Sequence, residues 1–228
     1  MKKINKILKK EKLLMAATPI LILLLFILLY LKGFTMDNIK FKKEYENLNI
    51  EYYTIKINNN NPIKYSNYNE VFKVIKKKTG IIFLGYPEDN NSRFAIEMLL
   101  KVIENNKFKT KIYYLNINND RDSYTIENNK LVYQKINNEK IKGTKNYFKL
   151  LKLLDNYLPE YIISLDDKDF KVGEKRIYFP SFIFVKNGKI IDVYSATTDL
   201  ESSEIYNTFE NYLLTMYSSC KSRNGKLC

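Results

Sequence analysis

The sequence predicts one α/β domain, with a central mixed sheet flanked by helices, which follows a single membrane-spanning helix. Two observations predict the domain over residues 50–217. Segments of helical periodicity alternate there with short apolar runs, and 228 residues with 45% hydrophobic content can bury one ordinary core. The third observation is a long uncharged segment near the N-terminus, which predicts the membrane helix.

The uncharged segment runs from Leu13 to Leu31. At about 1.5 Å per residue, a helix of this length matches a hydrocarbon core of roughly 30 Å, so we expect it to contact membrane lipid. A cleaved signal peptide is the alternative, but small residues should then follow the apolar run, and residues 30–34 offer no such cleavage site. A lipoprotein signal would need a cysteine directly after the run, and the first cysteine is Cys220. The sequence therefore favours an uncleaved anchor.

The segments on either side of the span predict its orientation. Residues 1–12 form a basic leader with six lysines against Glu11. Because positively charged flanks stay in the cytoplasm, we expect a single-pass protein of the cell membrane with a cytoplasmic N-terminus and an extracytoplasmic domain. Residues 32–49 are expected to form a juxtamembrane stalk with a short helix, since apolar residues fall near helical spacing at Met36, Ile39, Tyr45 and Leu48.

The first half of the domain is expected to contain two strands, each followed by a helix. Apolar residues alternate with polar ones over residues 51–57 and predict a half-buried strand. Helical spacing predicts a helix in the segment that starts at Tyr68 and ends in three lysines before Gly80. The apolar residues 81–84 predict a second strand, and a second helix is expected to run to about Asn106.

The second half is expected to add a central strand, an insertion and a helix. Residues 111–117 predict the strand, and two apolar stretches around Asn128 and Asn129 predict a surface hairpin within residues 118–143. Thr144 is expected to cap a helix that ends before Pro159. Residues 162–172 predict a further turn or hairpin, which Gly173 should end.

The end of the domain is expected to be a hairpin and a helix. Residues 181–185 and 189–194 predict two strands joined by an Asn187-Gly188 turn, which is a strong hairpin signal. Helical spacing predicts the last helix over residues 201–217, and residues 218–228 form a tail with a cysteine pair.

The segment between the second strand and its helix resembles a known redox site without its cysteines. Residues 80–93 read GIIFLGYPEDNNSR. Together with the order of elements, this segment resembles the thioredoxin-like superfamily, and especially the membrane-anchored thioredoxin-like proteins of Gram-positive bacteria, whose site typically reads Gly-Phe-Pro-Glu-Cys-Pro-x-Cys-Arg. The Cys-x-x-Cys positions are occupied here by Asp89, Asn90, Asn91 and Ser92.

The resemblance assigns a second role to Pro180, which opens the strand over residues 181–185. In the family this position holds the cis-proline that faces the active turn, and only an X-Pro bond adopts the cis form at low cost. The alternative is an ordinary trans proline that begins an edge strand.

The family chemistry needs a thiolate that attacks and a second thiol that resolves the mixed disulfide. Asp89 and Ser92 supply neither, and the chain has no histidine that could activate a serine hydroxyl. These residue types instead satisfy the free amides at a helix N-terminus. Either they only keep the helix folded, or Asp89 imitates the charge of the lost thiolate and preserves a peptide-binding face beside Pro180.

Two cysteines remain in the tail, Cys220 and Cys228. An even pair outside the membrane suggests a disulfide. The alternative is a redox-active pair, because nearby basic residues would lower a thiol pKa. No metal or cofactor is expected, since two cysteines without histidine cannot close a tetrahedral zinc site within one chain.

The net charge of +13 is a weak indicator of partners. The leader carries a large share of it, and the remainder is spread along the chain without a clustered basic stripe, so no nucleic-acid partner is expected. Attraction to anionic lipid or to a wall polymer stays open.

Three hypotheses for function follow. The first is a membrane-tethered thioredoxin-like domain without thiol-disulfide exchange at the usual site, which binds exported polypeptides or an envelope partner. The second is a thiol-disulfide oxidoreductase that works through Cys220 and Cys228. The third is a structural accessory subunit of a membrane assembly.

Overall fold

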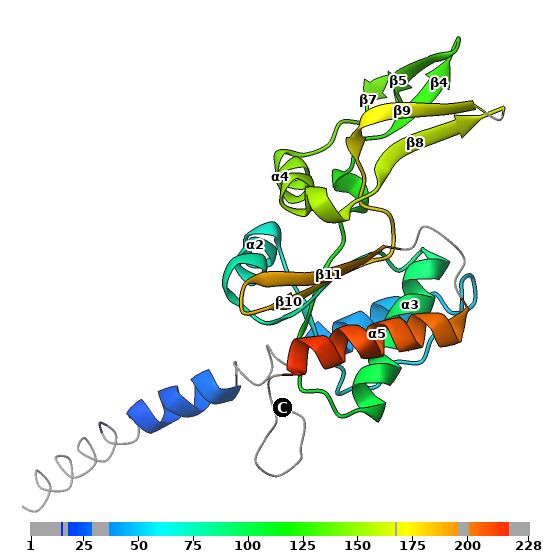
Figure 1. Ribbon diagram of the computed structural model, residues 1–228. Coiled ribbons are helices and arrows are strands. Elements are labelled where there is room, and N and C mark those ends of the chain that lie inside the picture. Colours follow the sequence, from blue (N-terminus) through cyan, green and yellow to red (C-terminus); the bar gives the residue numbers. More distant parts are fainter. Residues whose placement is uncertain (1–14, 16–17, 29–36, 167, 196–200, 219–228) are drawn as a thin grey trace, which may run out of the picture.

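A five-stranded mixed sheet forms the centre of the computed structural model, which describes residues 15, 18–28, 37–166, 168–195 and 201–218 (Figure 1). The strand order is β1-β3-β2-β10-β11. The first three of these strands are parallel, and β10 runs antiparallel to both β2 and β11. Their bounds are β1 (Ile63–Tyr65), β3 (Ile112–Leu115), β2 (Gly80–Leu84), β10 (Ser181–Lys186) and β11 (Lys189–Ser195). The predicted α/β class with a mixed sheet is therefore confirmed.

Helices cover both faces of the sheet, so residues 81–84 of β2 and 182–185 of β10 are apolar and buried at every position. Ile82 and Leu84 of β2 pack in one cluster with α2 (Tyr68–Lys77) and α4 (Lys145–Leu154). Ile81 and Phe83 point the other way, into a cluster with α3 (Asn90–Asn105) and α5 (Ser202–Tyr217). Figure 1 shows α2 on one side of β10 and β11, and α3 and α5 on the other.

A set of hairpins is inserted between β3 and β10, and Figure 1 shows it extending away from the central sheet beside α4. The predicted hairpin around Asn128 and Asn129 is confirmed: both residues have the positive φ that a tight hairpin turn requires. The inserted strands are β4 (Tyr124–Glu127), β5 (Lys130–Tyr133), β6 (Lys135–Ile136), β7 (Glu139–Lys140), β8 (Glu160–Leu165) and β9 (Lys168–Lys175), with short 3-10 turns at Asn118–Asp120 and Asp155–Tyr157. Gly173 was expected to end this strand, but it lies inside β9. The pairing of β8 and β9 is irregular at this point, and such an irregularity accommodates the positive φ of Gly173 without ending the strand.

The strand predicted over residues 51–57 is wrong. Ile55 and Ile57 are buried, as their alternation suggested, but the segment pairs with no strand. Side chains satisfy its backbone instead: the amide of Ile55 donates to Asn49 Oδ1 and that of Ile57 donates to Glu46 Oε1. The first strand is β1, which follows Pro62 and pairs in parallel with β3.

The boundary predicted between a stalk and a domain at residue 50 needs correction. Residues 37–46 form the expected helix, but this helix belongs to the core, where Phe41 and Tyr45 are completely buried. Phe41 stacks on Tyr45 with 4.2 Å between ring centroids and meets the ring of Tyr114 edge-on at 5.0 Å. Of the residues used to predict a helix here, Ile39 is half exposed. The buried face of this helix therefore contains Phe41 and Tyr45 and does not contain Ile39.

Residues 18–28 are helical with exposed side chains. Within the residues that the structure describes, no helix is both long and apolar enough to cross a membrane. Several residues of the predicted span from Leu13 to Leu31 lie outside that set, and so do the basic leader of residues 1–12 and the tail with Cys220 and Cys228.

Candidate functional site

Helix α3 begins directly after the turn that follows β2, and Asp89 is its N-cap residue. Asp89 has an extended backbone, with φ −97° and ψ 114°, and its Oδ2 accepts a hydrogen bond of 2.7 Å from the amide of Ser92. The Ser92 hydroxyl donates to the same oxygen. An N-cap carboxylate that accepts from the third residue on is a common way to satisfy a free amide at a helix start.

Ser92 is completely buried beneath the turn. Gly85 closes over it, since a Cβ added at Gly85 would lie 2.8 Å from Ser92 Oγ and 2.6 Å from the ring of Phe83. A nucleophilic hydroxyl must reach the substrate. The Ser92 hydroxyl is buried and donates a hydrogen bond to Asp89. The turn therefore offers no exposed nucleophile at this position.

Asn90 and Asn91 are exposed at the first turn of α3. Asn90 Oδ1 accepts a hydrogen bond of 2.7 Å from the amide of Tyr53. The Tyr53 hydroxyl donates to Glu97 Oε2 at 2.9 Å, and its ring meets Phe94 edge-on with centroids 5.4 Å apart. Burial, and then the bond to Glu97, raise the pKa of Tyr53. The segment around Tyr53 is therefore attached to the start of α3.

Arg93 fixes the same segment from inside the protein. Its side chain is completely buried, and it donates from Nε to the Tyr53 carbonyl at 2.6 Å, from one terminal nitrogen to the Pro87 carbonyl at 3.0 Å and from the other to Asn49 Oδ1 at 2.6 Å. No carboxylate of the described chain forms an ion pair with it. Burial lowers the pKa of Arg93. The sequence motif includes Arg93 but gives no sign of this role, because its partners are backbone carbonyls and Asn49, which lie elsewhere in the chain.

Pro180 lies next to the turn, as the resemblance implied. The Phe179–Pro180 peptide bond is cis, and the following Ser181 pairs with Leu84 at the end of β2. The ring of Phe179 meets that of Tyr86 edge-on with centroids 5.0 Å apart. Tyr86 belongs to the turn itself, so the proline segment and the turn form one surface.

Arg121 supports Phe179 from behind. Its guanidinium lies 3.9 Å from the centre of the Phe179 ring and donates to the Ile177 carbonyl at 3.3 Å. Burial, and then the positive charge of Arg176, lower the pKa of Arg121 to about 10. Arg176 in turn donates to the backbone carbonyl of Asp122 at 2.8 Å. No sequence pattern singled out these arginines, because they lie in irregular segments.

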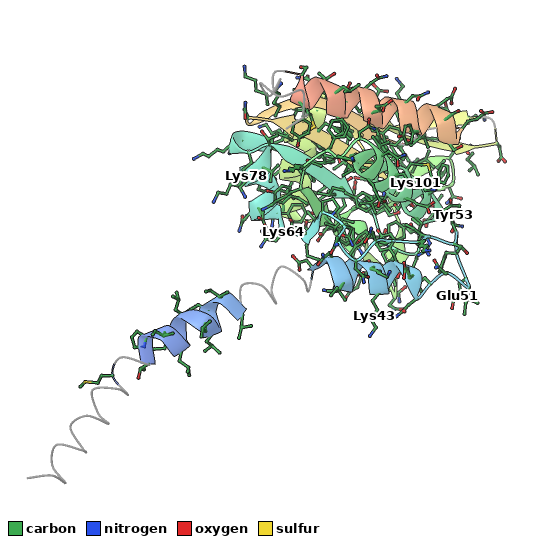
Figure 2. All side chains as sticks on the ribbon, turned by 90° about the horizontal axis from the view of Figure 1, so that it is seen from below. Lys43, Glu51, Tyr53, Lys64, Lys78 and Lys101 are labelled. Atoms are coloured by element: carbon green, nitrogen blue, oxygen red, sulfur yellow. The ribbon has the colours of Figure 1, made fainter. Side chains whose placement is uncertain are left out.

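Three aromatic side chains lie in the turn or on segments that contact it. Tyr53, whose amide bonds to Asn90, is 37% exposed, and Tyr86 and Phe179 are half-buried. Figure 2 shows Tyr53 with Glu51 at one end of the domain. In the described part of the chain, no group of three or more His, Cys, Asp or Glu side chains could hold a metal ion. The turn therefore presents aromatic rings and polar side chains for contact, while its serine hydroxyl is covered.

The four turn residues and Pro180 are thus brought together, whereas Cys220 and Cys228 lie outside the described residues. No protein-family model matches the sequence, and a search of curated proteins gives no significant match.

Proposed function

We propose that this protein is a thioredoxin-like domain that binds polypeptide segments at the turn before α3 and exchanges no disulfides there. The segment from Leu13 to Leu31 tethers it to the cell membrane, with the domain outside the cytoplasm. The strand order β1-β3-β2-β10-β11, with three parallel strands followed by two antiparallel ones, supports the thioredoxin-like fold. The place of the turn after β2 and beside Pro180 supports it as well.

One observation carries the proposed loss of chemistry: Ser92 is fully buried and its hydroxyl donates a hydrogen bond to the carboxylate of Asp89. Around this inert pair the surface is held in place by Arg93 and Arg121 and carries the rings of Tyr53, Tyr86 and Phe179. Aromatic rings with nearby polar groups bind extended chains through apolar contact and hydrogen bonds. The exposed side of the turn thus remains a binding surface.

Photocrosslinking tests this surface in the full-length protein in its membrane. A benzophenone amino acid replaces Asn91, which is exposed at the turn, and in a control protein it replaces Lys130, which is exposed on the inserted hairpin. We expect an added unfolded polypeptide to crosslink at Asn91 and not at Lys130, and Tyr86→Ala to reduce the yield severalfold. Equal yields at the two positions would refute a binding surface at the turn.

Insulin reduction by the full-length protein tests the absence of redox chemistry. We expect no activity above that of Cys220→Ser and Cys228→Ser variants. Activity that disappears with either substitution would assign the chemistry to the tail and would overturn the proposal.

A further inference from the structure

Charge is divided between the two helical layers of the domain. Helices α2 and α4, on one face of the sheet, carry six exposed lysines against one glutamate, Glu70. Helices α3 and α5, on the other face, carry four glutamates against one exposed lysine, Lys101, because Arg93 is buried. The six lysines are Lys73, Lys76, Lys77, Lys145, Lys149 and Lys152, and we call the surface that they form the lysine face.

The lysine face is continuous across the two helices. Lys149 of α4 places its ammonium group 4.6 Å from the centre of the Phe72 ring on α2, and both helices pack on one core cluster. The turn between β10 and β11 adjoins the end of α2, because the amide of Gly188 donates to the Lys78 carbonyl at 2.8 Å. This contact brings the exposed Lys189 to the same region. Figure 2 shows Lys64 and Lys78 on the side away from Lys101.

The lysines of this face form no ion pairs within the described part of the protein, although Asp155, Glu160 and Glu174 line one cavity with Lys152. Glu70 forms ion pairs with Lys64 and Lys78, at 2.6 and 3.7 Å, and so it is already used. None of the six lysines forms an ion pair with a carboxylate that the structure describes. Six unpaired ammonium groups on one surface create a positive field that attracts a polyanion.

We propose that the lysine face lies on the surface of an anionic lipid bilayer. Lysine is a hydrated point charge that suits mobile headgroups, whereas arginine suits fixed bidentate contacts. The arginines that the structure describes are used differently: Arg93, Arg121 and Arg176 point inward and bind backbone carbonyls. Nucleic acid is less suited to this face, because no arginine that the structure describes points outward there to form bidentate contacts with phosphates or base edges.

The tether supports the choice of a membrane, and this step rests on the proposed function. Only residues 32–36 separate the apolar segment from the helix over residues 37–46, and five residues extend over roughly 18 Å at most. Electrostatic attraction acts over about 8 Å at physiological ionic strength. The tether limits how far residue 37 can lie from the bilayer, and the orientation of the domain decides which of its surfaces lies within that range. The lysine face and the glutamates of α3 and α5 lie on opposite faces of the sheet, so an anionic bilayer attracts the first and repels the second.

Lysine acetylation, followed by mass spectrometry, tests this orientation in the full-length protein. The protein is placed in vesicles of phosphatidylcholine alone and in vesicles of phosphatidylcholine with an equal part of phosphatidylglycerol. We expect acetylation of Lys73, Lys149 and Lys152 to slow severalfold in the anionic vesicles, while Lys101 and Lys109 react equally in both. The protection should disappear at high salt. Equal rates for all lysines in the two kinds of vesicle would overturn the proposal.

Charge reversal provides a matched comparison. Each lysine near an anionic surface strengthens binding about fivefold. In the double variant Lys149→Glu with Lys152→Glu, we therefore expect the acetylation rate of Lys73 in anionic vesicles to rise to its rate in neutral vesicles. Lys101→Glu with Lys109→Glu, on the other side, should leave the protection unchanged. Protection that survives the first pair of substitutions would refute the lysine face as the contact.

Two further arms separate the alternatives. Duplex DNA is added to the protein in neutral vesicles, where we expect no protection of the lysine face. Protection by DNA without protection by phosphatidylglycerol would overturn the lipid assignment.

Flotation with neutral vesicles reports on the tether alone. If the protein does not float but anionic vesicles still protect the lysine face, the tether of the proposed function fails and the lysine face stands.

Discussion

The hydroxyl of Ser92 donates a hydrogen bond to the carboxylate of Asp89 at the start of α3. These are the two positions at which the thioredoxin-like resemblance expects cysteines, so a hydrogen bond joins them where a disulfide would form. The same carboxylate oxygen accepts the amide of Ser92. Closure of the first helical turn is thus achieved without a group that can be oxidised or reduced.

Asp89→Ala should destabilise the protein by about 2 kcal/mol, because it removes the N-cap and leaves the buried Ser92 hydroxyl without its acceptor. Asp89→Asn keeps an acceptor oxygen and should cost less. Urea unfolding of the full-length protein measures both, with Asn91→Ala as the control at an exposed neighbour. Equal stability of Asp89→Ala and Asn91→Ala would show that the cap is unimportant.

Arg93→Met should cost about 3 kcal/mol, since it removes the donor from the carbonyls of Tyr53 and Pro87 and one of the two donors to Asn49 Oδ1. The loss should concentrate in the segment around Tyr53. Hydrogen exchange of residues 49–53 should therefore accelerate more than that of β2. Lys101→Met on the exposed side of the same helix is the control, and similar exchange in the two variants would contradict the assigned role of Arg93.

The sequence predicted the sheet well where both faces are buried. Residues 81–84 and 182–185 are continuous apolar runs, and such runs allow few other structures between breaking residues. The alternation over residues 51–57 predicted a strand that does not form, because alternating burial does not require a strand partner. The amides of Ile55 and Ile57 donate to the side chains of Asn49 and Glu46 instead. Local periodicity reports which side chains are buried but not which groups their backbone binds.

The candidate site was predicted only in part, for a related reason. The turn with Asp89 and Ser92 has a local signature, and so does Pro180 before its strand. Arg121 and the Tyr53 segment have none, because they reach the site through tertiary contacts with Phe179 and Asn90. The lysine face was also missed. Its charges lie on two helices that are far apart in the sequence, and they form one surface only because α2 and α4 pack on the same side of the sheet.

A pair of glycine substitutions tests how the β10–β11 turn docks on α2. Gly188 and Gly173 both have positive φ, of 74° and 86°, so alanine at either should cost about 1 kcal/mol of backbone strain. A Cβ at Gly188 would also lie 2.3 Å from the Lys76 carbonyl oxygen, whereas one at Gly173 meets nothing within 4 Å. Gly188→Ala should therefore lose a further 1–3 kcal/mol, about what overpacking costs. Urea unfolding compares the two, and equal losses would contradict this contact.

Tyr147 on α4 should make the domain sensitive to alkali. Burial, as the main cause, raises the pKa of Tyr147 from 10.0 to about 12, against the opposing charge of Arg176. The unfolded chain therefore loses this proton at lower pH than the folded protein, so the stabilisation is complete below pH 10 and is lost as pH rises toward 12. Tyr147→Phe removes this dependence, which amounts to at most about 3 kcal/mol between those limits. Urea unfolding at pH 8 and pH 11 measures the fall in the free energy of unfolding between these pH values, which should be smaller for Tyr147→Phe than for the natural protein. Tyr157→Phe, at an exposed position, is the control and should show the same fall as the natural protein. An unchanged fall in Tyr147→Phe would place the alkaline sensitivity elsewhere.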